Sequence, residues 1–125
     1  MTEHILNLTV GESANANLAR AAKTMDALER GDTVQPYFGV GFSSVGDLFA
    51  VFTPRRWELL ATLREGGSMT VAELTRRLQR DYKNVHGDVE KLQAWQVIER
   101  DADGMIFAPY SEIVVDVHLP DGKVA

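Results

Sequence analysis

The stretch that decides the fold is TVAELTRRLQRDYKNVHGDVEKLQAW, which runs from Thr70 to Trp95. Thr70 and Glu73 give the T-x-x-E pattern of a capping box, in which each side chain accepts a hydrogen bond from the other residue's backbone N–H. Asp81 is a good N-cap for a following helix, because its carboxylate suits the positive end of that helix. The stretch therefore predicts two helices joined by a turn of three residues.

Apolar side chains in both helices recur at spacings of three and four residues, which places one stripe of each helix against a core. In the first helix the stripe consists of Leu74 and Leu78. In the second helix, expected over about 82–95, it consists of Tyr82, Val85, Val89 and Leu92. The residues between these positions consequently point outwards; they are Lys83, Asn84, Gly87, Glu90 and Lys91.

A third helix is expected before this pair, and a hairpin after it. Thr53 followed by Pro54 is a helix start, because threonine caps well and proline suits the first helical position. That helix ends at Gly66 and Gly67. After Trp95, two short apolar runs flank an Asp-Gly pair, which is a hairpin signal because glycine supplies the positive φ of such turns. Helix, helix, turn, helix and hairpin is the order of a winged helix-turn-helix domain.

The segment from Phe52 to Asp101, FTPRRWELLATLREGGSMTVAELTRRLQRDYKNVHGDVEKLQAWQVIERD, resembles a family of small prokaryotic transcriptional regulators of the MarR-like type. The most specific part is RDYKNVHGDVEKL, from Arg80 to Leu92. The resemblance implies sequence-specific binding of double-stranded DNA by the helix from Tyr82, as a dimer and without a cofactor. Such proteins commonly have glycine before the first wing strand, whereas this chain has Gln96. Gln96 must therefore adopt a left-handed conformation or end the helix differently.

The flanking segments predict strands and one more helix. Alternating side chains over 4–10 and 113–119 are typical of half-buried strands. Between them, Leu18, Ala21, Met25 and Leu28 form the apolar stripe of a helix that Ser13 can cap and Gly31 can end. Residues 37–42 could form another strand. Residues 45–52 are compatible with either a strand or a short helix.

The overall prediction is an α+β fold with three regions along the chain. Residues 1–52 form an N-terminal strand-helix arm, residues 53–109 the winged helix-turn-helix domain, and residues 110–125 a C-terminal strand and tail. The arm and the last strand have apolar faces that the central domain does not need. We therefore expect them to form a homodimer, with folding back onto their own domain as the competing possibility.

Composition limits the classes of function. The chain of 125 residues has no cysteine, which excludes disulfides and thiolate metal sites. It lacks an apolar run of the roughly 20 residues that span a membrane, and its first residues do not resemble a signal peptide. We expect a cytoplasmic protein without a membrane partner.

The net charge of −5 at first disfavours a nucleic-acid partner, but the charge is unevenly distributed. From Thr53 to Arg100 there are nine Lys or Arg and seven Asp or Glu, whereas the rest of the chain has four and eleven. Arg76, Arg77, Arg80 and Lys83 lie within eight positions. This cluster is either a DNA-binding surface or an ordinary solvated helix face.

The candidate DNA contacts are spread over the two helices and the hairpin. Lys83 and Asn84 lie in the first turn of the second helix, where side chains typically meet base edges in the major groove. The alternative is an exposed turn in which Asn84 bonds locally. Arg76, Arg77 and Arg80 are better candidates for phosphate contacts, because they precede the inserted helix. Arg100, in the first hairpin strand, completes this group.

Two further candidates in the second helix have structural alternatives of equal standing. Gly87 costs about 1 kcal/mol relative to alanine in a helix interior. A close approach by DNA or by another chain would explain it, and so would simple tolerance. His86 lies beside the apolar stripe, so it is either a DNA contact or a partly buried histidine.

No catalytic pattern, phosphate-binding glycine loop or metal motif stands out, so we expect neither an enzyme nor a cofactor or metal site. The first hypothesis is a transcriptional regulator. The second is a protein-interaction module, such as the antitoxin of a toxin-antitoxin pair, whose acidic flanks bind a protein partner. A winged helix that has lost DNA binding is the third.

Overall fold

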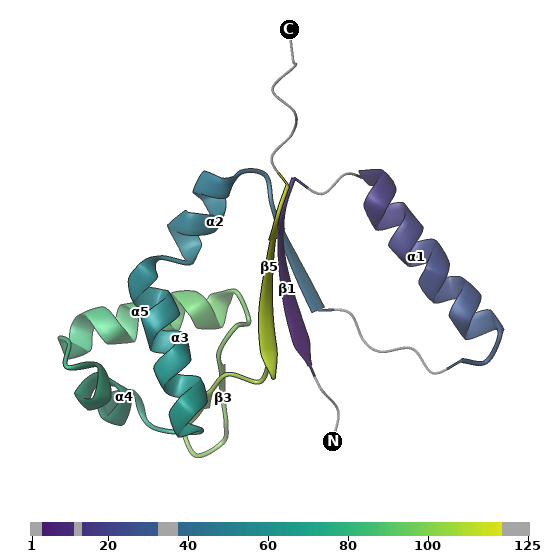
Figure 1. The fold of residues 1–125 in the computed structure, drawn as a ribbon. Coiled ribbons are helices and arrows are strands. Elements are labelled where there is room, and N and C mark those ends of the chain that lie inside the picture. Colours follow the sequence, from purple (N-terminus) through teal and green to yellow (C-terminus); the bar gives the residue numbers. More distant parts are fainter. Residues whose placement is uncertain (1–3, 12–13, 33–37, 119–125) are drawn as a thin grey trace, which may run out of the picture. The chain divides into compact units, whose positions relative to one another are not determined.

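The computed structural model describes residues 4–11, 14–32 and 38–118 (Figure 1). Within these ranges the chain forms five helices and five strands, so the prediction of an α+β fold is confirmed. The chain divides into two units. Unit 1 consists of Met1–Leu48 and Ser111–Ala125, and unit 2 consists of Phe49–Tyr110.

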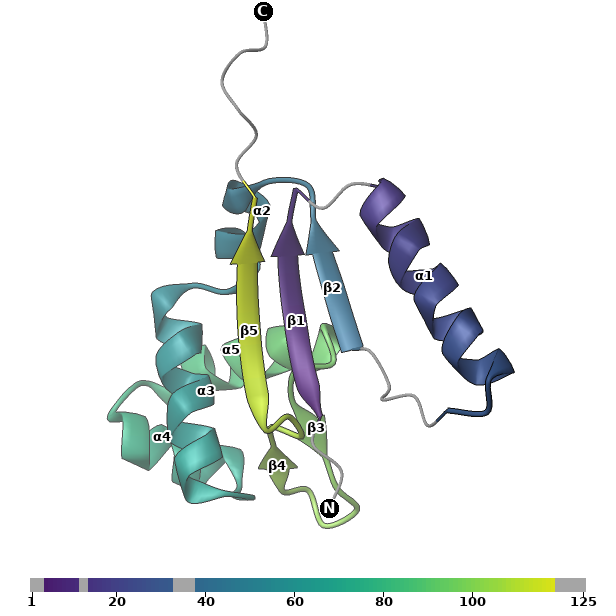
Figure 2. The same cartoon turned by 45° about the vertical axis from the view of Figure 1, so that its right-hand side comes forward.

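Unit 1 contains a parallel sheet of three strands in the order β2-β1-β5 (Figure 2). The strands are β1 (Ile5–Val10), β2 (Phe38–Phe42) and β5 (Glu112–Val117). Parallel neighbours need crossover connections. The connection from β1 to β2 contains helix α1, and the connection from β2 to β5 contains the whole of unit 2. The first and last strands, which the sequence places in separate regions, are therefore direct neighbours in one sheet.

The central strand β1 is the most buried strand of this sheet. Its side chains alternate as expected: Leu6, Leu8 and Val10 share one face and are at most 3% exposed. On β5, Val115 and Val117 occupy the same face by register but are 44% and 40% exposed. The alternating segment near the C-terminus is thus a strand, as predicted, and forms an edge of the sheet.

At the end of β1, the backbone of Val10 and Gly11 lies close to the backbone of His118, which follows β5. The His118 N–H donates to the Val10 carbonyl at 2.9 Å. Gly11 follows with a φ of +79°, and a Cβ at this position would lie 2.4 Å from the His118 carbonyl oxygen. Only glycine satisfies both the left-handed conformation and the close contact.

The helix expected in the N-terminal arm is α1 (Ala14–Glu29). Its end is confirmed: the Gly31 N–H donates to the Leu28 carbonyl at 3.1 Å, and Gly31 has a φ of +79°. The proposed cap Ser13 lies outside the described residues. The short segment that the sequence left open is a helix, α2 (Val45–Val51).

Unit 2 is built on three helices whose starts the sequence predicts correctly: α3 (Pro54–Gly66), α4 (Val71–Leu78) and α5 (Tyr82–Ala94). Thr53 Oγ1 accepts from the Arg56 N–H at 3.2 Å, and Thr70 Oγ1 from the Glu73 N–H at 3.1 Å. Asp81 Oδ2 accepts from the Asn84 N–H at 3.4 Å. Gly67 ends α3 with a φ of 74°.

The core of unit 2 draws on all three helices. Fully buried side chains include Leu59, Leu60 and Leu63 of α3, Leu74 of α4, and Val85, Val89 and Leu92 of α5. The assignment of Tyr82 to the apolar stripe is wrong, because its side chain is 52% exposed. Tyr82 is the first residue of α5, and at this end of the helix the apolar stripe no longer contacts the core.

The expected hairpin consists of β3 (Glu99–Arg100) and β4 (Ile106–Phe107), with Gly104 at a φ of +81° in the turn. The Met69 backbone adds an antiparallel bridge to Ile106. Of the two alternatives for Gln96, the left-handed conformation is observed, with a φ of 64°. The Tyr110 hydroxyl donates to the Gln96 carbonyl at 3.2 Å and stabilises this connection.

Candidate functional site

The candidate site is the outward side of α4, α5 and the turn between them. Gln79 makes the turn possible with a left-handed conformation, φ 54° and ψ 45°, and its N–H donates to the Arg76 carbonyl at 3.2 Å. Asp81 then starts α5. Because the Val85, Val89 and Leu92 side is buried, the other side of α5 faces solvent. We call its exposed N-terminal part, Tyr82, Lys83, Asn84 and Gly87, the α5 face.

Lys83 and Asn84 present their side chains at the surface, as predicted. The backbone N–H of Asn84 is used in the Asp81 cap. Within the described part of the chain, neither side chain has a hydrogen bond or ion pair with another residue. Both are therefore available to an external ligand.

Tyr82 is a member of the α5 face that the sequence analysis missed. Its ring stacks on His86, with the ring centroids 5.8 Å apart and an interplanar angle of 24°. His86 Nδ1 lies 3.4 Å from Glu90 Oε1, and its side chain is 41% exposed. The structure thus places His86 at the margin of the α5 face, half-buried and supporting the Tyr82 ring. The spacing from Val85 suggested burial of Tyr82, and its position in the first turn was the signal against it.

Gly87 lies on the α5 face. It has an ordinary helical conformation, with a φ that is not positive. A Cβ built at this position would meet nothing within 4 Å. No contact with the described residues therefore requires glycine here.

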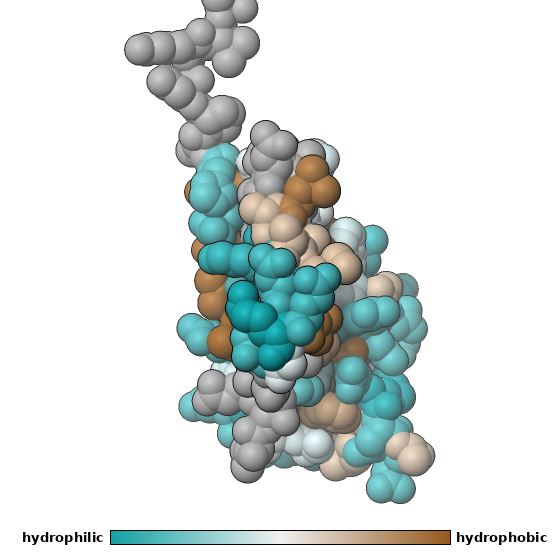
Figure 3. Space-filling view, turned by 90° about the vertical axis from the view of Figure 1, so that its right-hand side faces the viewer, coloured by the Kyte–Doolittle hydropathy of each residue, from teal (hydrophilic) through white to brown (hydrophobic). Residues whose placement is uncertain are grey.

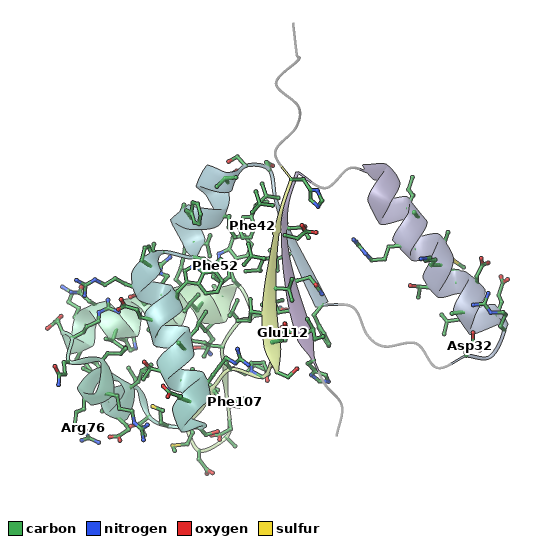
Figure 4. All side chains as sticks on the ribbon, in the orientation of Figure 1. Asp32, Phe42, Phe52, Arg76, Phe107 and Glu112 are labelled. Atoms are coloured by element: carbon green, nitrogen blue, oxygen red, sulfur yellow. The ribbon has the colours of Figure 1, made fainter. Side chains whose placement is uncertain are left out.

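Arg76 and Arg77 share one carboxylate on α4. Arg76 donates to Glu73 Oε2 through Nε at 3.0 Å and also through Nη2, and Arg77 Nε donates to Glu73 Oε1 at 3.3 Å. These hydrogen bonds lower the pKa of Glu73 below its ordinary value, and the bond from Arg76 has a larger effect than the bond from Arg77. The side chains remain accessible, at 74% for Arg76 and 46% for Arg77. Figure 4 shows Arg76 at the periphery of unit 2.

Arg80 differs from the expectation of a phosphate contact. Its side chain is only 11% exposed, and Nη2 lies 2.8 Å from Asp88 Oδ2. Arg56 Nε approaches Asp88 Oδ1 at 3.1 Å, and Arg56 Nη1 donates to the Val51 carbonyl at 2.8 Å. The exposed surface therefore lacks the Arg80 guanidinium, which joins the turn to the middle of α5.

Arg56, Arg80 and Asp88 form a largely buried cluster of charged side chains, which we call the Asp88 cluster. Sequence reasoning missed Arg56 and Asp88. Asp88 lies three residues after Val85 and four residues before Leu92, and both of these belong to the buried stripe. A carboxylate at such a position needs a cationic partner, because a buried unpaired charge is costly. That spacing was the available signal.

The last predicted contact, Arg100, lies on β3 with an exposed side chain whose Nη1 donates to the Gly104 carbonyl at 3.4 Å. The structure thus distributes the predicted residues over three parts of unit 2. Lys83, Asn84, His86 and Gly87 lie on α5, Arg76 and Arg77 on α4, and Arg100 on the hairpin.

Two other kinds of feature are absent from the described ranges. There, no three His, Asp or Glu side chains gather closely enough to hold a metal ion. None of the helices found in those ranges has the length and apolar character needed to cross a membrane.

The chain belongs to the HVO_A0114 family, whose family model matches residues 51–115. This match covers nearly all of unit 2 and reaches into β5. Comparisons with curated proteins and with solved structures gave no match.

Proposed function

We propose that unit 2 is a winged helix-turn-helix domain and that the protein is a sequence-specific DNA-binding transcriptional regulator. In this proposal α4 and α5 form the helix-turn-helix and β3-β4 forms the wing. One observation carries the proposal: the first turn of α5 presents Lys83 and Asn84 without partners among the described residues, while the opposite side of α5 is buried.

The chemistry of the α5 face suits the major groove. N-terminal residues of a recognition helix typically contact base edges. An asparagine amide can form two hydrogen bonds with adenine, and a lysine ammonium can reach guanine or phosphate. We assign these roles to Asn84 and Lys83. Tyr82 adds a hydroxyl and an aromatic edge beside them, and Gly87 lets the groove approach the α5 backbone.

Phosphate contacts are assigned to Arg76 and Arg77, whose exposed guanidiniums are held by Glu73. A guanidinium suits phosphate because its N–H groups can bind two oxygens at once. Arg100 would contact the backbone from the wing. Arg80 has another role in this proposal: with Asp88 it fixes the orientation of α5, so it is a positioning residue.

Binding selection from a pool of random duplexes tests the proposal. We expect the full chain to enrich one sequence motif, and Lys83→Ala and Asn84→Ala to bind the enriched duplex more weakly. Arg64→Ala is the control, because it removes an exposed charge from the last turn of α3, outside the proposed interface. Failure to enrich any motif, or equal affinity of all three variants, would reject the proposal.

A further inference from the structure

Large apolar side chains are exposed in both units of the described chain. In unit 1 they lie on β1, α1 and β5, and Figure 3, viewed from the right-hand side of Figure 1, shows apolar residues at the surface among hydrophilic ones. In unit 2 they are two aromatic residues, Phe49 of α2 at 56% exposure and Tyr82 of α5 at 52%. Single exposed apolar side chains are common on protein surfaces. Tyr82 differs because its ring is held in place and lies on the α5 face.

The Tyr82 ring is held by a series of side chains along one side of α5. Tyr82, His86 and Glu90 follow one another at intervals of four residues, so they are neighbours on the helix surface. His86 Nδ1 lies 3.4 Å from Glu90 Oε1, and the His86 ring stacks on the Tyr82 ring with the centroids 5.8 Å apart. Glu90 therefore orients His86, and His86 fixes the plane of the Tyr82 ring.

The surface of Tyr82 that remains accessible is mainly apolar. Because His86 covers one face of the ring, the exposed part consists of the other face and the edges. Within the described part of the chain, the Tyr82 hydroxyl has no hydrogen-bond partner and can stay hydrated. A ring that is already ordered loses little conformational freedom on binding. The α5 face thus presents a preorganised apolar surface next to Lys83 and Asn84.

We propose that Tyr82 contacts the 5-methyl group of a thymine in the major groove, with His86 as a positioning residue. This inference rests on the proposed function, in which the first turn of α5 enters the groove. Among the four bases, thymine alone offers a methyl group there, and the other base edges offer hydrogen-bond donors and acceptors. A fixed apolar surface at the base edges therefore selects thymine. Tyr82 adds this preference to the adenine contact assigned to Asn84.

Replacement of thymine by deoxyuridine tests the contact, because it removes only the methyl group. The probe is the duplex that the full chain enriches, with each thymine replaced in turn. At one thymine the natural chain should lose about fourfold in affinity, the effect of burying one methyl-sized group. Tyr82→Ala should bind both duplexes equally, and Tyr82→Phe, which retains the ring, should keep the preference. Phe49→Ala is the control, because it removes another exposed aromatic ring of unit 2 and should also keep the preference.

Two substitutions test the role of His86. His86→Ala should reduce the preference for thymine over uracil, because the Tyr82 ring loses its support. His86→Phe should restore the preference, since a flat ring can stack in the same place. Base discrimination by Asn84 should be unchanged in both variants. An unchanged thymine preference in His86→Ala would reject the positioning role.

The outcomes separate this inference from the proposed function. Failure to enrich any motif removes both. An enriched motif in which every thymine can be replaced without loss overturns the thymine contact alone. Equal weakening by Tyr82→Ala and Tyr82→Phe, with no difference between thymine and uracil, assigns the contact to the hydroxyl and overturns it as well. A thymine preference that persists in Tyr82→Ala belongs to another residue and also overturns the inference.

Discussion

Arg80 Nη2 lies 2.8 Å from Asp88 Oδ2 and ties the turn before α5 to the middle of that helix. The same carboxylate accepts a hydrogen bond from Arg56 of α3, whose guanidinium also bonds the last carbonyl of α2. Both guanidiniums are largely buried. One carboxylate therefore fixes α5 relative to two other elements of unit 2.

Asp88→Ala should strongly destabilise unit 2, because it leaves two guanidiniums buried without their anion. Breaking a buried ion pair costs about 3–5 kcal/mol. Urea unfolding followed by tryptophan fluorescence measures this change, since both tryptophans, Trp57 and Trp95, belong to unit 2. Glu90→Ala is the matched control on the same helix: its side chain is 65% exposed, and the expected change is below about 1 kcal/mol. Equal effects of the two substitutions would show that the Asp88 cluster contributes little.

Arg76→Ala and Arg77→Ala should each weaken binding to all duplex sequences to a similar extent. Each phosphate contact contributes about 0.9 to the slope of log affinity against log salt concentration, so each variant should lower the slope by about that amount. Salt titration of the binding constant is the measurement. Arg80→Ala should instead lower the stability of unit 2. An unchanged salt slope with altered base preference for Arg76→Ala would contradict the phosphate assignment.

Gly87→Ala should change stability and DNA affinity in opposite directions. The added methyl meets nothing within 4 Å, and alanine is favoured over glycine in a helix by about 1 kcal/mol. The variant should therefore be more stable to urea. DNA affinity should fall, because the methyl occupies space that the groove needs. If affinity is retained, Gly87 is only tolerated and is not part of the interface.

Gly11→Ala should weaken the pairing of β1 with β5. Gly31→Ala is a close control, because both glycines have a φ of +79° and both variants take on the same backbone strain, about 1–2 kcal/mol. Only at residue 11 does the new methyl collide with a carbonyl, that of His118. Hydrogen exchange at the His118 amide, which donates to Val10, should therefore accelerate more in Gly11→Ala. The same rate in both variants would mean that the strand end relaxes without loss.

Signals confined to a few neighbouring residues were predictable from the sequence. The caps Thr53, Thr70 and Asp81, the stop at Gly31 and the hairpin turn each depend on local backbone chemistry, and they appear as expected. The second half of the capping box does not form, because the Glu73 carboxylate accepts from Arg76 and Arg77 instead of the Thr70 N–H. The exposure of Lys83 and Asn84 followed from the periodicity of α5.

Features that depend on distant partners were not predictable in this way. The neighbouring positions of β1 and β5 are not encoded in either strand alone, because alternation specifies a strand but not its partner. Arg80 looked available because its partner Asp88 lies in the next helix and the second cation, Arg56, lies in α3. Tyr82 shows the limit of periodicity at the end of a helix, where the apolar stripe no longer meets the core.

The most direct test of DNA recognition by α5 is a double-mutant cycle between Asn84 and the base pairs of the selected duplex. Affinities of the natural chain and of Asn84→Ala would be measured for the selected duplex and for duplexes with one changed base pair. We predict that Asn84→Ala loses about 1–3 kcal/mol of discrimination at a single A·T position and none elsewhere. A uniform loss at every position, or none at any, would contradict base recognition by α5.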